Sequence, residues 1–208
     1  MKKLKSTWYN MAGVLTGIAL VAGAALASVN EMTKDTIQQL KEKSEQDAIA
    51  QVLGGGDVKV QQIDTVAIND CNYIVMNAGE KGVAVKAVDP QNASFGGGLT
   101  IMVGIDPNGV VLGYSILETH ETPGLGAKAN EWFQKGQKGD IIGRNLAESK
   151  LTVSKDGGDV DAITASTITS RAFLRAVNAA NEAFYQTIAK EEHNADGISG
   201  ASKKNNNK

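Results

Sequence analysis

The sequence has few of the residues on which most catalytic and metal sites depend. Its 208 residues include one cysteine, Cys71, two histidines and three prolines, and aromatic residues make up 5%. A single cysteine excludes an intrachain disulfide, and it excludes an iron–sulfur cluster or zinc site held only by thiolates of this chain. The two histidines, His120 and His193, form no evident Cys–His pair. The chain therefore offers little for covalent nucleophilic catalysis.

A long uncharged run near the N-terminus is the first feature that is present. Residues 8–29 carry no charge, and at 1.5 Å per residue roughly 20 apolar residues span a bilayer core. Three lysines precede the run and no acidic residue occurs before Glu31, so the positive-inside rule puts the N-terminus in the cytoplasm and the remaining chain across the membrane. The run predicts a transmembrane anchor. A signal peptide cleaved after residues 25–27, Ala-Leu-Ala, is the alternative.

The net charge of the chain beyond the anchor argues against some classes of binding partner. After the first three lysines, 18 of the 21 basic residues remain against 23 acidic ones, a balance of about −5. A mildly acidic surface argues against nucleic acid, and against binding to anionic lipid through a basic patch. Roughly 180 residues lie beyond the membrane, which is enough for one ordinary core.

The pattern of apolar residues beyond the anchor predicts an α+β fold. A polar helix is expected from residue 31 to about 53, ended by three glycines. A long amphipathic helix is expected from residue 172, because apolar residues recur there at spacings of three and four. Between the two helices, short β-branched runs separated by turn signals predict an antiparallel sheet, with the long helix packed across one face. The expected strands are residues 58–68, 72–76, 82–88, 99–105, 110–117 and 151–153.

A hydroxyl-rich segment stands directly before the long helix. Residues 161–170 read Asp-Ala-Ile-Thr-Ala-Ser-Thr-Ile-Thr-Ser. Free backbone N–H groups and the positive end of the helix dipole make such a helix start a good place for a phosphate. Serine and threonine are also favoured helix N-caps, so capping alone is the alternative interpretation of the segment.

This segment resembles the flavinylation motif of the FMN-binding domain family, which runs Asp, two free positions, Ser or Thr, Gly or Ala, Ala, then Thr. Here Asp161, Thr164, Ala165 and Thr167 occupy the motif positions, and Ser166 stands where alanine is usual. The resemblance implies that FMN is joined through its phosphate to Thr167 by a phosphoester bond. It also implies a separate Mg²⁺-dependent flavin transferase that uses FAD as donor. The hydroxyl of Ser166 is the alternative acceptor.

Two further segments extend the resemblance. Residues 95–99, Phe-Gly-Gly-Gly-Leu, resemble the family's aromatic-Gly-Gly segment, and residues 118–126 resemble its Glu-Thr-Pro-Gly-Leu-Gly loop. Glycines in both segments allow the backbone to approach a planar ring closely. A turn or bulge, a solvated loop, and a metal site at His120 are the alternatives, and we predict no metal. The resemblance adds these residues to the expected FMN site: Gly97, Glu121, Thr122, Gly124, Leu125 and Gly126.

Length and layout resemble the G subunits of Rnf-type ion-translocating electron-transfer complexes. That resemblance implies a bacterial inner-membrane protein with its C-terminal domain on the periplasmic side. It also implies a covalent FMN that relays electrons between cofactors of membrane and iron–sulfur or flavin subunits, with ferredoxin and NAD chemistry in those partners. The close alternative is the C subunit of sodium-translocating NADH:quinone reductases, which is usually longer. A periplasmic flavoprotein feeding a reductase and a membrane-tethered binding module without flavin are the others.

The expected organisation follows from these features. Residues 1–7 are predicted to be cytoplasmic, 8–29 to be a transmembrane helix and 30–56 to be a linker helix. Residues 57–192 are predicted to form the FMN-binding domain. The Asn-rich end, 193–208, is predicted to be a disordered tail.

Overall fold

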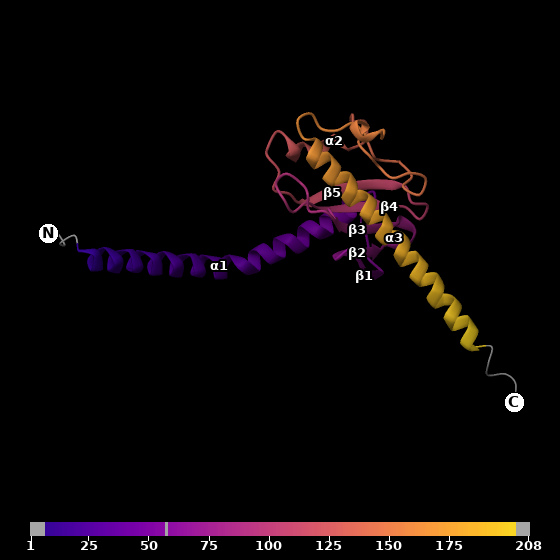
Figure 1. Ribbon diagram of the computed structural model, residues 1–208. Coiled ribbons are helices and arrows are strands. Elements are labelled where there is room, and N and C mark those ends of the chain that lie inside the picture. Colours follow the sequence, from indigo (N-terminus) through magenta and orange to yellow (C-terminus); the bar gives the residue numbers. More distant parts are fainter. Residues whose placement is uncertain (1–6, 57, 203–208) are drawn as a thin grey trace. The chain divides into compact units, whose positions relative to one another are not determined.

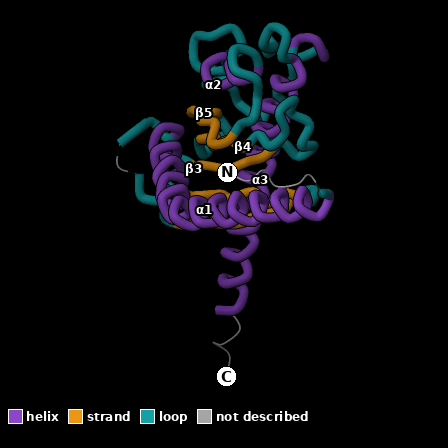
Figure 2. Tube along the Cα trace, turned by 90° about the vertical axis from the view of Figure 1, so that its left-hand side faces the viewer, coloured by secondary structure: helices purple, strands orange, loops and turns teal. Residues whose placement is uncertain are grey.

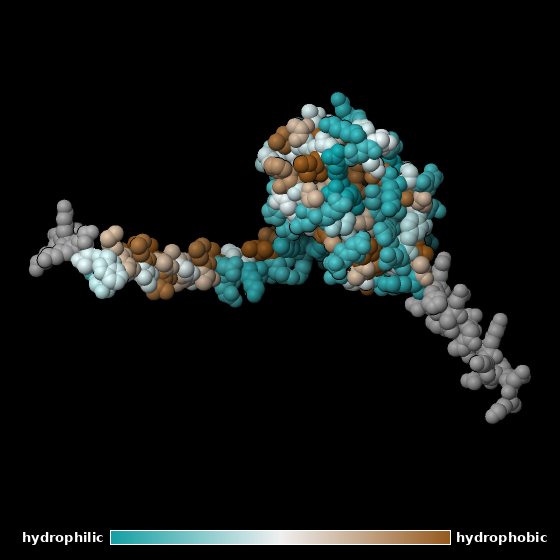
Figure 3. Space-filling model, in the orientation of Figure 1, coloured by the Kyte–Doolittle hydropathy of each residue, from teal (hydrophilic) through white to brown (hydrophobic). Residues whose placement is uncertain are grey.

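The computed structural model describes residues 7–56 and 58–202, with side chains described as far as residue 190. The chain forms two compact units, Met1–Ser44 and Glu45–Lys208. Helix α1 (Trp8–Val52) accounts for the described structure of the first unit and contributes its last turns to the second. Figure 3 shows a hydrophobic stretch of this helix followed by a hydrophilic one.

Helix α1 is the one helix among the described residues that is long and apolar enough to cross a membrane. Its apolar side chains before residue 30 are exposed, for example Leu15 and Val21. The predicted anchor and the predicted linker helix are a single helix of 45 residues. The physical reason is local, because no glycine or proline occurs between Gly23 and the end of the helix.

The three glycines after α1 end the helix as the sequence predicted. Gly54, Gly55 and Gly56 all have φ near +80°, a conformation that glycine adopts at no steric cost. The N–H of Gly55 donates to the carbonyl of Ala50 at 2.7 Å. This is the six-to-one bond of a Schellman C-cap, which satisfies a carbonyl that the helix leaves without a partner.

The second unit contains a five-stranded antiparallel sheet in the order β1-β2-β3-β4-β5. The sequence predicted these five strands to within four residues at each end. The sixth predicted strand, 151–153, is wrong: only Val153 pairs, through one parallel bridge to Val160, because the surrounding segment is a turn. The strands are β1 (Gln62–Ile68), β2 (Cys71–Asn77), β3 (Val83–Val88), β4 (Thr100–Ile105) and β5 (Val111–Glu118).

Both faces of the sheet are covered. Helix α3 (Thr167–Ser202) crosses one face (Figures 1 and 2), as the sequence predicted. The last turns of α1 bury Ala48, Ile49 and Val52 with Met76 and Met102 in a second, smaller cluster. The sequence did not predict this second cover, because a polar linker helix gives no sign of where its few apolar residues pack.

The register of the strands explains how each face receives its helix. One row across the sheet is large and buried, and it faces the main core with α3: Val75, Val85, Val103 and Tyr114. The next row faces α1 and is small at its end: Met76, Ala84, Gly104 and Gly113. A Cβ at Gly104 would lie 2.2 Å from the carbonyl oxygen of Val52, so glycine there permits the close approach of α1.

Residues 119–166, between β5 and α3, contain only short helices: η2 (Gly126–Lys128), α2 (Ala129–Trp132) and η3 (Ser154–Asp156). Phe133 anchors this segment by stacking on Phe173 of α3, with ring centroids 4.4 Å apart. The hydroxyl of Tyr114 donates to the carbonyl of Ala129 at 2.6 Å. A connection this long in a small domain is usually functional.

Helix α3 continues to Ser202, so the boundary expected at residue 192 lies within the helix. The backbone of residues 193–202, predicted as part of a disordered tail, is helical in this structure. Helical hydrogen bonds are made within the segment itself, so a helix can run on past the last residue that packs on the sheet. Residues 203–208 of the predicted tail lie outside the described residues.

Candidate functional site

A cavity of about 340 Å³ lies where the hydroxyl-rich segment meets two loops of the second unit. This volume falls in the range of small-molecule sites. Its lining residues come from three separate parts of the sequence: Phe95; Glu121, Thr122, Leu125 and Gly126; and Ala165, Ser166, Thr167, Ile168 and Thr169.

A larger groove of about 670 Å³ follows another side of α3. It is lined by residues such as Tyr73, Asn178 and Tyr185, and it contains none of the predicted site residues. The chemistry of the lining residues therefore decides between the two cavities, and size does not.

The hydroxyl-rich segment reaches the cavity through a tight turn. Ala165 has φ +62°, in the left-handed region that alanine seldom occupies, and the N–H of Ser166 donates to the carbonyl of Ile163 at 3.0 Å. The hydroxyl of Ser170 accepts the N–H of Ile163 at 2.9 Å and lies 3.0 Å from the carbonyl of Ser166. A small residue at position 165 fits this turn, in keeping with the Gly-or-Ala position of the motif.

The hydroxyl-bearing residues of this turn differ in how far they are exposed to solvent. Ser166 is 8% exposed and Thr169 is 1% exposed, whereas Thr167 is half-buried and is the first residue of α3. Thr164 is exposed but does not line the cavity. Thr167 thus combines partial exposure of the residue with a position at both the helix start and the cavity wall.

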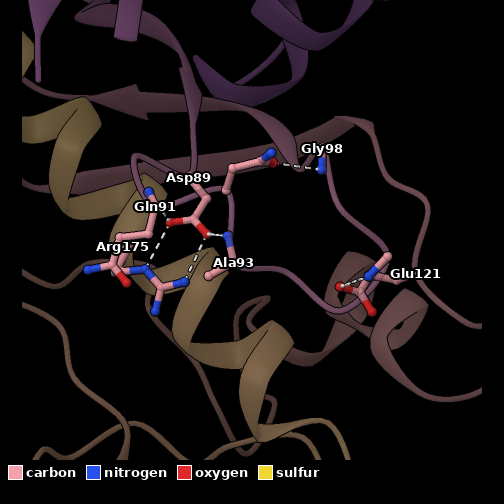
Figure 4. A network of polar contacts seen from close by, with 8 residues as sticks. Asp89, Gln91, Ala93, Gly98, Glu121 and Arg175 are labelled. Atoms are coloured by element: carbon pink, nitrogen blue, oxygen red, sulfur yellow. Dashed lines mark hydrogen bonds and ion pairs between the residues drawn. The ribbon is translucent and has the colours of Figure 1, made fainter. Parts of the chain in front are cut away.

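The second wall is built around a buried carboxylate. Glu121 is 8% exposed, and its Oε1 accepts the N–H of Gly96 at 3.3 Å (Figure 4). Gly126 lies against the other oxygen, since a Cβ there would come within 2.3 Å of Glu121 Oε2 and 2.8 Å of Thr169 Oγ1. Any side chain at position 126 would displace the carboxylate.

The glycine-rich segment packs on the same loop. A Cβ at Gly96 would lie 2.1 Å from the carbonyl oxygen of His120, so the two family-like segments touch through their backbones. Gly97 and Gly124 have φ of +70° and +78° and nothing within 4 Å of the Cβ position. Gly96 and Gly126 therefore allow close packing of the protein on itself, whereas Gly97 and Gly124 serve turns.

The loop that carries Phe95 and Gly96 is tied to α3 by a buried ion pair (Figure 4). Arg175 contacts both oxygens of Asp89 at 2.8 Å, and the Asp89 side chain is 1% exposed. The backbone N–H groups of Gln91 and Ala93 also donate to this carboxylate. Burial by itself raises the pKa of Asp89, but these hydrogen bonds and the Arg175 charge outweigh it, so the pKa lies below its usual value.

The structure brings together seven of the eleven predicted site residues: Glu121, Thr122, Leu125, Gly126, Ala165, Ser166 and Thr167. Gly97, Gly124, Asp161 and Thr164 do not line the cavity. Asp161 instead links loops, because its backbone carbonyl accepts from Trp132 Nε1 at 2.8 Å and its carboxylate from Ser154 Oγ at 3.4 Å.

Three lining residues were not among those predicted: Phe95, Ile168 and Thr169. Phe95 is 73% exposed and Ile168 is 51% exposed, and together with Leu125 they gather exposed apolar side chains at one cavity. The sequence could have indicated that Ile168 does not pack in the core, since this residue does not continue the buried stripe of α3 that begins at Phe173. Phe95 was visible as an aromatic residue followed by glycines.

The lining fits FMN in its chemistry. Leu125, Phe95 and Ile168 offer apolar surface for an aromatic ring, and Thr167 offers a hydroxyl at a helix N-terminus, where N–H groups favour a phosphate. Within residues 7–56 and 58–202, no group of three metal-ligating side chains is positioned to hold a metal.

Comparison with known proteins agrees with an FMN site. Residues 94–182 match the FMN-binding domain family, and residues 1–52 match the RnfG N-terminal region. The chain is 33% identical to the G subunit of the ion-translocating oxidoreductase complex of Shewanella amazonensis, over 79% of this chain and 82% of that protein. It is 34% identical to the protein of the same name in Salmonella typhimurium, over 79% and 87%.

A further relative is the G subunit of the Na(+)-translocating ferredoxin:NAD(+) oxidoreductase complex of Acetobacterium woodii, 29% identical over 91% of this chain and 98% of that protein. The fold and the site thus define a protein with an FMN-binding domain and an N-terminal helix apolar enough to span a membrane. The chain belongs to the family of G subunits of ion-translocating oxidoreductase complexes.

Proposed function

We propose that this chain is the FMN-carrying subunit of an Rnf-type, ion-translocating electron-transfer complex, with FMN attached covalently to Thr167. The observation that carries the proposal is the position of Thr167. Thr167 is half-buried, is the first residue of α3, and lines a cavity together with residues of the family's loop and with Phe95 of the glycine-rich segment. When bound, FMN supplies reversible redox chemistry, and the protein supplies position, solvent exclusion and local charge.

Burial supports Thr167 over the neighbouring hydroxyls. A phosphoester on Ser166 would need a side chain that is 8% exposed to accept a bulky group inside a packed turn. Thr164 has the access but lies outside the cavity. Of the three, Thr167 alone combines access with the cavity, so one attachment site meets both requirements.

The role of an electron relay follows from family membership and from what the site contains. The described residues that line the cavity include one buried carboxylate, Glu121, and several hydroxyls, but no cysteine or histidine. We infer that electrons pass between FMN and cofactors of partner subunits, and that a flavin transferase installs the FMN. The match of residues 1–52 to the RnfG N-terminal region favours this assignment over a C-type subunit of an NADH:quinone reductase or a reductase-feeding flavoprotein.

The proposal predicts a yellow protein. Full-length chain co-expressed with a flavin transferase should gain the mass of one FMN less one water, and it should keep flavin fluorescence after denaturation. The same chain expressed without the transferase should be colourless and unmodified. Intact mass spectrometry and fluorescence of a denaturing gel check both results. A colourless product in the presence of active transferase contradicts the proposal and favours a binding module without flavin.

The proposal also predicts the side of the membrane on which the FMN domain lies. With three lysines before an uncharged span, the N-terminus should stay in the cytoplasm and the FMN-binding domain should be periplasmic. Alkaline phosphatase fused after Lys208 should therefore be active, and a cytoplasm-dependent fluorescent reporter at the same position should be dark. The reverse pattern, or a mature N-terminus at Ser28, contradicts the predicted anchor.

A further inference from the structure

A lysine outside the family motif contacts the acceptor hydroxyl. Lys155 Nζ lies 3.2 Å from Thr167 Oγ1, within hydrogen-bonding distance, although the two residues are 12 positions apart. An ammonium group at that distance from the esterified oxygen is also within reach of the oxygens that a phosphate on Thr167 would add.

The backbone that presents Lys155 is fixed. Lys155 is the middle residue of η3, and the carboxylate of the next residue, Asp156, accepts hydrogen bonds from both Nε and Nη2 of Arg171 at 2.6 Å. Arg171 lies one helical turn after Thr167 on α3. The turn that carries the lysine is therefore clamped to the same helix that carries the acceptor. The bridge between Val153 and Val160 closes the other side of the turn.

We propose that Lys155 is a positioning residue for the phosphodiester of the FMN linkage. This inference rests on the proposed function. In the transfer, the Thr167 Oγ1–P bond forms, the bond from that phosphorus to the AMP portion of FAD breaks, AMP leaves, and the hydroxyl proton goes to a base. The product is a phosphodiester of one negative charge. Lys155 donates a hydrogen bond to that group, and the N-terminal N–H groups of α3 reinforce the positive potential.

The charges around the cavity favour one orientation of the bound FMN. The Lys155 ammonium contacts Thr167 without itself lining the cavity, and the buried carboxylate of Glu121 lies at the wall formed by the loop of residues 121–126. Lys155 and the helix start would therefore hold the phosphate, and the apolar side chains of Phe95, Leu125 and Ile168 would contact the ring. Lys155 would restrict the motion of the flavin as well as assist its attachment.

The test compares Lys155→Gln with Lys155→Arg in the full-length protein. With purified flavin transferase, FAD and Mg²⁺, Lys155→Gln should slow the initial rate of adduct formation about fivefold, a size set by an exposed charge-assisted contact. The loaded variant should also show lower flavin fluorescence anisotropy, because the phosphodiester is no longer held. Lys155→Arg should restore both values to within about twofold, since it keeps the charge and a hydrogen-bond donor.

Lys150→Gln is the matched control. Lys150 is an exposed lysine of the same long segment, but it lines the larger groove, whereas Lys155 contacts Thr167. It should behave as wild type. The inference is overturned if Lys155→Gln matches wild type in rate and anisotropy, if Lys155→Arg fails as Lys155→Gln does, or if Lys150→Gln is equally slow. A slow rate with unchanged anisotropy also overturns it, since the lysine would then serve the transferase.

Failure of the proposed function is distinguishable from failure of this inference. If wild-type chain gains no adduct, or if the adduct maps to a residue other than Thr167, the attachment site itself is wrong. If wild type is modified at Thr167 and the Lys155 variants behave as wild type does, the attachment site stands and Lys155 has no part in it.

Discussion

Replacing Thr167 with alanine should abolish the covalent flavin completely. The alanine lacks the oxygen that forms the phosphoester bond, and the neighbouring Ser166 hydroxyl is held in a turn where it is 8% exposed. Thr167→Ser should retain the adduct, because it keeps the oxygen at the first residue of α3. Intact mass spectrometry of full-length protein co-expressed with the transferase measures all three forms.

Two neighbouring substitutions control for the shape of the segment. Thr164→Ala removes an exposed hydroxyl outside the cavity, and Ser166→Ala restores the alanine that the family motif usually has. Both should keep the adduct. An adduct that persists on Thr167→Ala and disappears on Ser166→Ala would move the attachment to Ser166.

Breaking the Asp89–Arg175 pair should produce the largest loss of stability of any single polar change in the FMN-binding domain. Asp89 is almost fully buried, and Arg175→Met would remove its counter-charge, leaving the carboxylate only the backbone N–H groups of Gln91 and Ala93. Removing one partner of a buried pair typically costs about 3–5 kcal/mol. The loop of residues 89–98, which carries Phe95 to the cavity, should loosen with it. Thermal unfolding of the full-length protein in detergent, followed by tryptophan fluorescence, measures the effect.

The exposed pair Asp156–Arg171 provides a matched comparison. It has the same two-bond geometry, but its side chains are 37% and 41% exposed. Asp156→Asn should therefore change the unfolding temperature little, because solvent already screens the charges. Equal effects of Arg175→Met and Asp156→Asn would show that burial does not govern the contribution of these pairs.

The Asp89 pair should also make stability depend on pH in the acid range. The folded pKa of Asp89 lies below its unfolded value, so its contribution to stability is present above the unfolded pKa, about 3.9 for an aspartate. That contribution is lost as the pH falls through the lower, folded pKa. The difference in unfolding temperature between wild type and Asp89→Asn should be constant near neutral pH and shrink below about pH 4.

The sequence patterns did not predict how the segments of the cavity are arranged relative to one another. The motif of residues 161–167 indicated an acceptor, and the loop of residues 118–126 indicated a partner segment, yet neither pattern states that they line the same cavity. The meeting depends on Gly126, whose missing side chain leaves room for the Glu121 carboxylate beside Thr169. Such a close approach is set by atoms from distant parts of the chain, which no local spacing records.

Lys155 illustrates the same limit at a single residue. In the sequence it is an ordinary lysine in a polar stretch, 12 residues before the acceptor. Its position beside Thr167 comes from the η3 turn and from the Asp156–Arg171 pair that joins this turn to α3. A sequence pattern could find the acceptor, whereas only the folded chain identifies what lies next to it.

The sequence by itself determined the local elements of this protein. Helix α1 follows from a run that has no proline and no glycine after Gly23, its end follows from Gly54–Gly56, and the five strands follow from β-branched runs between turns. Helical hydrogen bonds join residues a few positions apart, and the strands are marked by side-chain and turn preferences of neighbouring residues, although their ladders pair more distant ones such as Val83 and Ile105. The tertiary structure decided which surfaces meet: the last turns of α1 on the glycine row of the sheet, and Phe95, Glu121 and Lys155 around Thr167. Such contacts require burial and chain reversal over tens of residues, so packing of the whole domain determines them.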